Sequence, residues 1–94
     1  QSQLLRAYCY PNPMSTYTNI TFTLTQDEQV KVLIYDVNGS VIRVFESQMY
    51  YAGENHLIWD GRNQRGGVVP NGMYFFELVT TNKSFRDRIL ILRD

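Results

Sequence analysis

The sequence has few of the residues from which most catalytic and metal sites are built. It contains one histidine, one cysteine and one tryptophan in 94 residues. His56 has no neighbour in sequence that would complete a nucleophile–base pair or a metal site, so we expect an exposed strand position. A single cysteine, Cys9, cannot form a disulfide within the chain. We expect it to be a small buried hydrophobe, and a bridge to a neighbouring domain stays open. The sequence therefore predicts no catalytic residues and no enzyme activity.

The chain also lacks an excess of charge and a long apolar run. Nine basic and nine acidic side chains cancel, which leaves no overall field to attract nucleic acid or anionic lipid. No apolar stretch approaches the roughly 20 residues that span a bilayer. We therefore expect no nucleic-acid partner and no membrane span. With 94 residues, no initiator Met and no signal peptide, the chain is expected to be one domain, residues 1–94, excised from a larger protein.

Candidate metal and cofactor loops are incomplete. Asp60, Asn63 and Asn71 could offer oxygen ligands, yet the loop that holds them has one carboxylate against two arginines. The run Asp36-Val37-Asn38-Gly39 begins like a calcium loop but lacks the later ligands. No phosphate-binding glycine pattern is present. We expect no metal and no cofactor, and we expect Asp60 to accept hydrogen bonds from its own loop.

Alternation of apolar and polar residues is the dominant pattern, and no segment has a sustained helical stripe. Seven segments are expected to form strands: Leu4–Tyr10, Ile20–Leu24, Val30–Val37, Ser40–Phe45, the stretch around Leu57–Trp59, Tyr74–Leu78 and Phe85–Leu92. Asn38-Gly39 predicts a type I′ hairpin turn, with positive φ at both residues. Glu46–Gly53 is expected to be a loop. The fold class is all-β: an immunoglobulin-like β-sandwich of about seven antiparallel strands, with a barrel of similar strand count as the alternative.

Aromatic residues make up 14% of the chain, and most are explained by a core. The side chains expected to face inward are those of Phe22, Trp59, Tyr74 and Phe76. Tyr50, Tyr51 and Phe75 are not assigned to the core. Three exposed rings on one surface would suit stacking on a sugar or on a partner protein.

Several short motifs occur in a fixed order from about Tyr8 to Arg93. They are Tyr10-Pro11-Asn12-Pro13, Ile20–Leu24, Val32–Gly39, Ala52-Gly53, Trp59-Asp60-Gly61 and Asn71–Phe76. This series resembles the C-terminal sorting domain of type IX secretion cargo. It is also similar to the immunoglobulin-like domain of the flagellar hook-capping protein, which shares the pattern.

The resemblance to the sorting domains implies a function. Members of that family sit at the C-terminus of large exported proteins of Bacteroidetes and related bacteria. The resemblance implies a non-catalytic module that directs its parent through the periplasm and across the outer membrane, to be secreted or held at the cell surface. The implied partners are outer-membrane proteins of the secretion machinery and the remainder of the parent chain. The alternative is a structural or accessory module of an exoprotein, acting as a spacer or binding carbohydrate.

The same resemblance implies which residues would be recognised by the secretion machinery. Family members end in a basic pair, an apolar strand and a further basic residue. Here Asp87 separates the two basic residues, which departs from that pattern, and Ile89–Leu92 supplies the apolar strand. The expected recognition residues are Gly72, Tyr74, Arg86, Arg88 and Arg93. The alternative is that Tyr74 is core, Gly72 a turn residue and the arginines solvated strand positions.

Overall fold

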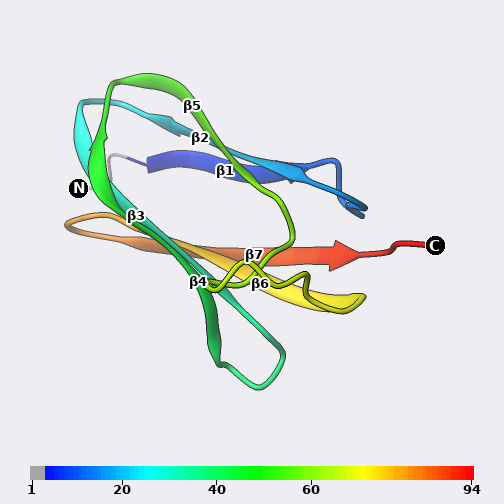
Figure 1. Ribbon diagram of the computed structural model, residues 1–94. Helices are drawn as coiled ribbons and strands as arrows, with labels where there is room; N and C mark the ends of the chain where they lie inside the picture. Colours follow the sequence, from blue (N-terminus) through cyan, green and yellow to red (C-terminus); the bar gives the residue numbers. More distant parts are fainter. Residues whose placement is uncertain (1–3) are drawn as a thin grey trace.

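The computed structural model describes residues 4–94, which form two antiparallel β-sheets packed face to face (Figure 1). One sheet has the order β1-β2-β5 and the other β4-β3-β6-β7. The three-stranded sheet contains β1 (Leu4–Tyr10), β2 (Thr18–Leu24) and β5 (Gly53–Trp59). The four-stranded sheet contains β3 (Glu28–Tyr35), β4 (Val41–Tyr50), β6 (Gly72–Val79) and β7 (Ser84–Ile91). Seven strands in two separate sheets confirm the predicted sandwich. Among residues 4–94 there is no helix that could cross a membrane.

The core lies between the sheets and follows the alternation of the sequence. Every second side chain of β2, β3 and β6 points into it, and the residues between them point outward. As predicted, Phe22, Trp59 and Phe76 are fully buried and Tyr74 is nearly so. Removing a side chain of this kind from water contributes about 1.5–3 kcal/mol to folding. The Trp59 and Tyr74 rings meet edge to face across the two sheets, with centroids 5.8 Å apart.

The segment after β1 joins the two sheets, because it pairs with the free edge of β7. The Met14 amide donates to the Leu90 carbonyl at 2.8 Å, and the Leu92 amide donates to the Met14 carbonyl at 2.9 Å. The Asn12 side chain donates to the Arg88 carbonyl and accepts from the Leu90 amide, both at 2.9 Å. Met14 is itself buried. The edge of β7 near the C-terminus is therefore closed by chain from the other sheet.

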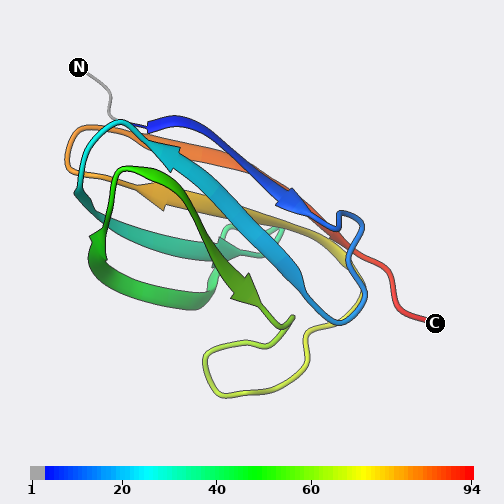
Figure 2. The ribbon, with the colours of Figure 1, turned by 90° about the horizontal axis from the view of Figure 1, so that it is seen from above.

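The loop between β5 and β6, which Figure 2 shows near the C-terminal end of the chain, forms hydrogen bonds with Arg93 after β7. The Asn71 side chain donates to the Arg93 carbonyl at 2.8 Å and accepts from the Arg93 amide at 3.1 Å. The Arg93 guanidinium donates to the Val69 carbonyl at 2.6 Å. Gly61 packs beside that guanidinium with φ +72°, where an added methyl group would overlap it. Glycine is favoured at Gly61 for both reasons.

The other exposed edge of the four-stranded sheet is β4, and the same loop covers part of it. The Gln64 amide donates to the Ile42 carbonyl, and the Gln64 side chain accepts from the Val44 amide, both at 2.8 Å. One glutamine thus pairs with two backbone groups of the edge strand, which protects it from pairing with another chain. Asp60 accepts from the Arg62 amide at 3.2 Å, as expected for a residue that orders its own loop.

The hairpin between β3 and β4 differs from the predicted type I′ turn. Gly39 has φ +84°, whereas Asn38 has a negative φ, since none of the described non-glycine residues has a positive one. The Asp36 carboxylate accepts from the amides of Asn38 and Ser40, and the Gly39 amide donates to the Asp36 carbonyl. The Asp36 side chain therefore determines the turn type. It stabilises a loop longer than the two-residue type I′ turn, and in this loop only the glycine needs positive φ.

The prediction of a loop at Glu46–Gly53 is wrong. The strand β4 continues to Tyr50, and β5 begins at Gly53. The cause is a tertiary contact: the Tyr50 ring lies edge to face against the buried Phe22 ring, with centroids 5.0 Å apart. This contact anchors the end of β4 opposite Glu28, which local sequence could not indicate.

Cys9 is half-buried and packs against the core from β1, as expected of a small hydrophobe. Burial, with a smaller effect from the nearby negative charge of Asp87, raises the pKa of the Cys9 thiol from 9.0 to about 12. Burial also raises the pKa of Tyr50 and of Tyr74. The folded state therefore favours the protonated form of all three groups.

The anchoring of the C-terminal residues gives a first prediction. Asn71→Ala removes both hydrogen bonds to the Arg93 backbone, so it should lower the free energy of unfolding by about 1–3 kcal/mol. The matched control is Asn82→Ala, because Asn82 lies in an exposed turn; its effect should stay within ~0.5 kcal/mol. Urea denaturation of the three proteins measures both changes. Equal losses in the two variants would contradict the anchoring role.

The raised pKa values give a second prediction. Since the folded state holds these protons more tightly, their contribution to stability is complete below pH 9 and is lost as the pH rises toward 12. The free energy of unfolding should thus fall above pH 9, and it should fall less in Cys9→Ala, which lacks the thiol. Urea denaturation at pH 7 and pH 11 gives the comparison. The same loss in both proteins would show that Cys9 contributes nothing to the pH dependence.

Candidate functional site

Two of the predicted recognition residues, Arg86 and Arg88, lie on the outer face of the four-stranded sheet. Both are exposed, on β7, and they alternate with the buried Ile89. In the register of the sheet, Arg86 is opposite Glu77 and Arg88 is opposite Phe75. We call this surface the arginine face and define it by Tyr35, Phe75, Glu77, Arg86 and Arg88.

The centre of the arginine face is held by three interacting side chains. The Tyr35 hydroxyl donates to Glu77 Oε1 at 2.6 Å. The Arg86 guanidinium carbon lies 4.8 Å from the centroid of the Tyr35 ring, and one of its nitrogens is 3.8 Å from Glu77 Oε1. The hydrogen bond to Glu77 is the largest cause that raises the pKa of Tyr35. The arrangement fixes the position of one arginine on the surface and leaves its outer side to solvent.

The other part of the arginine face is aromatic and carries a cation beside it. Phe75 is half-buried and pairs with Tyr35 on one side and with Arg88 on the other. The Arg88 side chain is exposed, and none of the described residues forms an ion pair with it. A partner that brings a carboxylate to this position would meet an arginine that has no competing anion.

Gly72 and Tyr74 do not belong to this surface. Gly72 begins β6 with φ +150°, a conformation that other residues rarely adopt. Tyr74 is only 6% exposed, and its hydroxyl donates to the Pro70 carbonyl at 2.7 Å. A partner cannot reach Tyr74 while the domain is folded. Tyr74 therefore belongs to the core, which was the alternative expectation, whereas Gly72 begins a strand and is not the expected turn residue.

Arg93 is separated from the other two arginines by its own contacts. Its guanidinium is turned toward the loop carbonyls of Val69 and Gly61, at 2.6 and 3.5 Å. It is half-buried. Arg93 therefore stabilises the end of the sandwich, and the basic residues available to a partner on β7 are Arg86 and Arg88.

The predicted aromatic surface of Tyr50, Tyr51 and Phe75 is not formed. Tyr50 packs against Phe22 at one end of β4, and its register partner is Glu28 at the start of β3. Phe75 pairs with Tyr35 at the other end of β3. Seven residues of strand place these two ends roughly 23 Å apart. Tyr51 is 69% exposed, but Tyr50 is turned toward the Phe22 ring and Phe75 lies on another strand, so the three rings do not form one exposed surface.

Candidate catalytic and metal residues do not converge within the described part of the chain. No group of three or more His, Cys, Asp or Glu among residues 4–94 could hold a metal ion. Asp60, which the sequence analysis weighed as a calcium ligand, forms ion pairs with Arg43 at 3.1 Å and Arg62 at 3.9 Å. His56 is exposed on β5, as expected.

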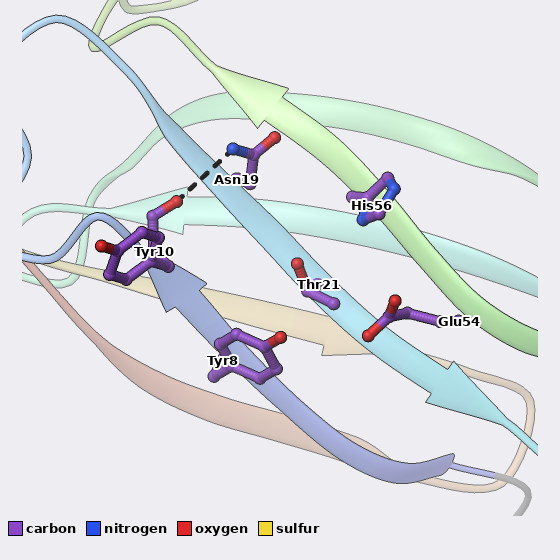
Figure 3. A pocket seen from close by; sticks show the side chains of 6 residues that line it. All are labelled: Tyr8, Tyr10, Asn19, Thr21, Glu54 and His56. Carbon is purple, nitrogen blue, oxygen red and sulfur yellow. Dashed lines mark hydrogen bonds between the residues drawn. The ribbon is translucent and has the colours of Figure 1, made fainter.

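Sequence reasoning missed the residues that the two sheets bring together. Tyr35 and Glu77 belong to the arginine face but lie 42 positions apart in the chain. On the three-stranded sheet, Tyr8 and Tyr10 lie across β2 from His56 and Ile58 (Figure 3). The alternation could have shown that each of these residues faces outward. Only the strand order, β1-β2-β5 and β3-β6-β7, makes them neighbours.

Three known proteins share sequence or structure with this chain. The basal-body rod modification protein FlgD of Salmonella typhimurium is 34% identical over 55 residues, which are 58% of this chain and 24% of FlgD. The chain thus spans about a quarter of that relative. Dimeric latent PorU of Porphyromonas gingivalis contains a similar fold, with a TM-score of 0.79 and 18% identity over 94% of this chain and 9% of PorU.

The third is PorZ of Porphyromonas gingivalis, described as an essential bacterial surface component of the type-IX secretion system. Its TM-score is 0.63 and its identity 25%, over 93% of this chain and 11% of PorZ. At the level of family, residues 14–84 match the FlgD Ig-like domain. Since this match covers most of the sandwich, the chain belongs to the family of FlgD Ig-like domains.

Proposed function

We propose that this domain is a non-catalytic sorting module of the type IX secretion system. It sits at the C-terminus of a larger exported protein and directs that protein from the periplasm across the outer membrane to the cell surface. Its partners are outer-membrane proteins of the secretion machinery and the rest of the parent chain. Nucleic acid is not among them.

The observation that carries this proposal is the similarity to PorZ along nearly the whole chain. A second support is the order of the sequence motifs, which resembles that of the sorting domains of type IX cargo. The fold, which PorU also contains, is shared by many proteins and does not by itself select a function.

The arginine face is the surface that we assign to recognition by the secretion machinery. Arg86 is held by the Tyr35 ring and Glu77, and Arg88 has no anion paired with it among the described residues. Half-buried Phe75 offers apolar area beside them. An aromatic and arginine surface of this kind is typical of protein–protein contacts. A partner with an acidic surface fits it best, since guanidinium groups bind carboxylates in pairs of hydrogen bonds.

A second candidate function is that of a structural or accessory spacer in a multidomain exoprotein. The membership in the FlgD Ig-like family and the 34% identity to FlgD favour it. A spacer contributes rigidity and length, and neither depends on Arg86 or Arg88. The two candidates therefore respond differently to changes on the arginine face.

Charge reversal of the arginine face is the third prediction. Residues 1–94 are fused to a periplasmic reporter in a bacterium with type IX secretion, and reporter is measured in the periplasmic and surface fractions. The double variant Arg86→Glu/Arg88→Glu should lower surface reporter at least ~10-fold, because it places carboxylates where an acidic partner binds. Circular dichroism of the purified domain checks that the variant is folded.

The matched control is Arg6→Glu/Arg65→Glu, which makes the same change of net charge at exposed positions outside the four-stranded sheet. It should leave export unchanged. Unchanged export of the arginine-face variant would remove that face from recognition. An equal loss in both variants would mean that net charge alone matters. A reporter that stays periplasmic even with the unaltered domain would refute the sorting function.

A further inference from the structure

The outer face of the three-stranded sheet has a hollow along its central strand, β2. The outward side chains of β2 are short, whereas those of the flanking strands are large. Tyr8 and His56 lie on either side of Thr21, and Tyr10 and Ile58 lie on either side of Asn19. The register thus builds a trough with two walls and a polar floor.

The trough contains a cavity of about 310 Å³ (Figure 3). Its lining residues come from all three strands: Tyr8, Tyr10, Asn19, Thr21, Glu54 and His56. This size is at the lower end of the range of small-ligand sites. It is open along its length, as the exposed side chains of both walls show.

One wall consists of two exposed tyrosines. Tyr10 is 72% and Tyr8 39% exposed, although tyrosine rings are mostly covered in a domain of this kind. They are two residues apart on one face of β1, which separates them by roughly 7 Å. The Arg6 guanidinium carbon lies 5.3 Å from the centroid of the Tyr8 ring and helps to hold it. The wall therefore offers two successive aromatic surfaces in a line.

The floor and the other wall are polar and available. The Asn19 side chain donates to the Tyr10 carbonyl at 3.5 Å, a long contact that leaves its oxygen free. Among residues 4–94, nothing hydrogen-bonds to the side chains of Glu54 or His56. Both are exposed on β5 and lie across the trough from the tyrosines (Figure 3). The site presents donors and acceptors opposite aromatic rings.

We propose that this trough binds a neutral oligosaccharide chain lying along β2. Sugar rings have apolar faces that stack on tyrosines and hydroxyl groups that bind amide, imidazole and carboxylate groups. Arg6 and Glu54 carry opposite charges at one end of the trough, so a polyanion would gain little. A peptide that adds a strand needs a free sheet edge, whereas β2 is paired on both sides. The inference is independent of the sorting function.

The site differs from the sugar-binding surface expected from the sequence. Tyr50 and Phe75 lie on different strands of the four-stranded sheet, β4 and β6, and Tyr51 lies in the connection between β4 and β5. Tyr8 and Tyr10 lie on one strand, β1, next to polar side chains of the strands β2 and β5.

Titration of the 94-residue domain with neutral hexasaccharides tests the inference. The probes are cellohexaose, xylohexaose, mannohexaose and chitohexaose, followed by isothermal calorimetry and by amide shifts of labelled protein. At least one probe should bind and should shift amides of β1, β2 and β5. Tyr10→Ala should weaken that binding at least ~10-fold, since stacking on one aromatic ring contributes on that scale. Tyr10→Phe, which keeps the ring, should stay within ~3-fold.

The matched control is Tyr51→Ala, because Tyr51, in the connection between β4 and β5, is as exposed as Tyr10, at 69%, and is not one of the residues that line the trough. It should leave the affinity unchanged. The inference is overturned if none of the four probes shifts these amides at about 5 mM, a concentration that would largely fill a site with a dissociation constant of about 1 mM. It is also overturned if Tyr51→Ala weakens binding as much as Tyr10→Ala. Tighter binding of hexagalacturonic acid than of every neutral probe would contradict the neutral ligand.

Discussion

The hydrogen bonds that hold residues 88–93 tie the segment after β1 and the loop between β5 and β6 to the end of β7. Asn12 and Met14, from the segment after β1, bind the edge of β7 on one side. Asn71 and Val69, from the long loop, bind the backbone and side chain of Arg93. The apolar core holds the sheets together without direction, whereas these bonds fix their relative position. Each outer face is built within one sheet, so these bonds set how the two faces lie relative to each other.

The two outer faces have different chemistry because their central strands differ. On the four-stranded sheet, β3 and β6 carry large outward side chains. Tyr35 and Glu77 contact Arg86 and hold it on a surface that also carries Arg88. On the three-stranded sheet, β2 carries threonine and asparagine outward, so its neighbours rise above it and form a trough. One surface suits a protein partner and the other a ligand that lies in a groove. Each can act without the other.

Much of the fold could be predicted from local sequence, because burial repeats every second residue. Phe22, Trp59 and Phe76 are buried as predicted for that reason. What escaped prediction depends on contacts distant in sequence: Tyr50 extends β4 through Phe22, and Asp36 replaces the expected turn through its carboxylate. The residues that make up the arginine face could be anticipated only in part. Arg86 and Arg88 could be named because they precede the apolar strand near the C-terminus, as basic residues do in the sorting domains. Their neighbours on the surface come from strands whose order the sequence does not reveal.

The central claim, that the domain directs export, is tested most directly in the native host of the parent protein. The parent is located, with and without residues 1–94, by mass spectrometry of periplasmic and surface fractions. The complete protein should reach the surface, and the shortened one should accumulate in the periplasm. Equal amounts of both proteins at the surface would contradict it and would favour the spacer function.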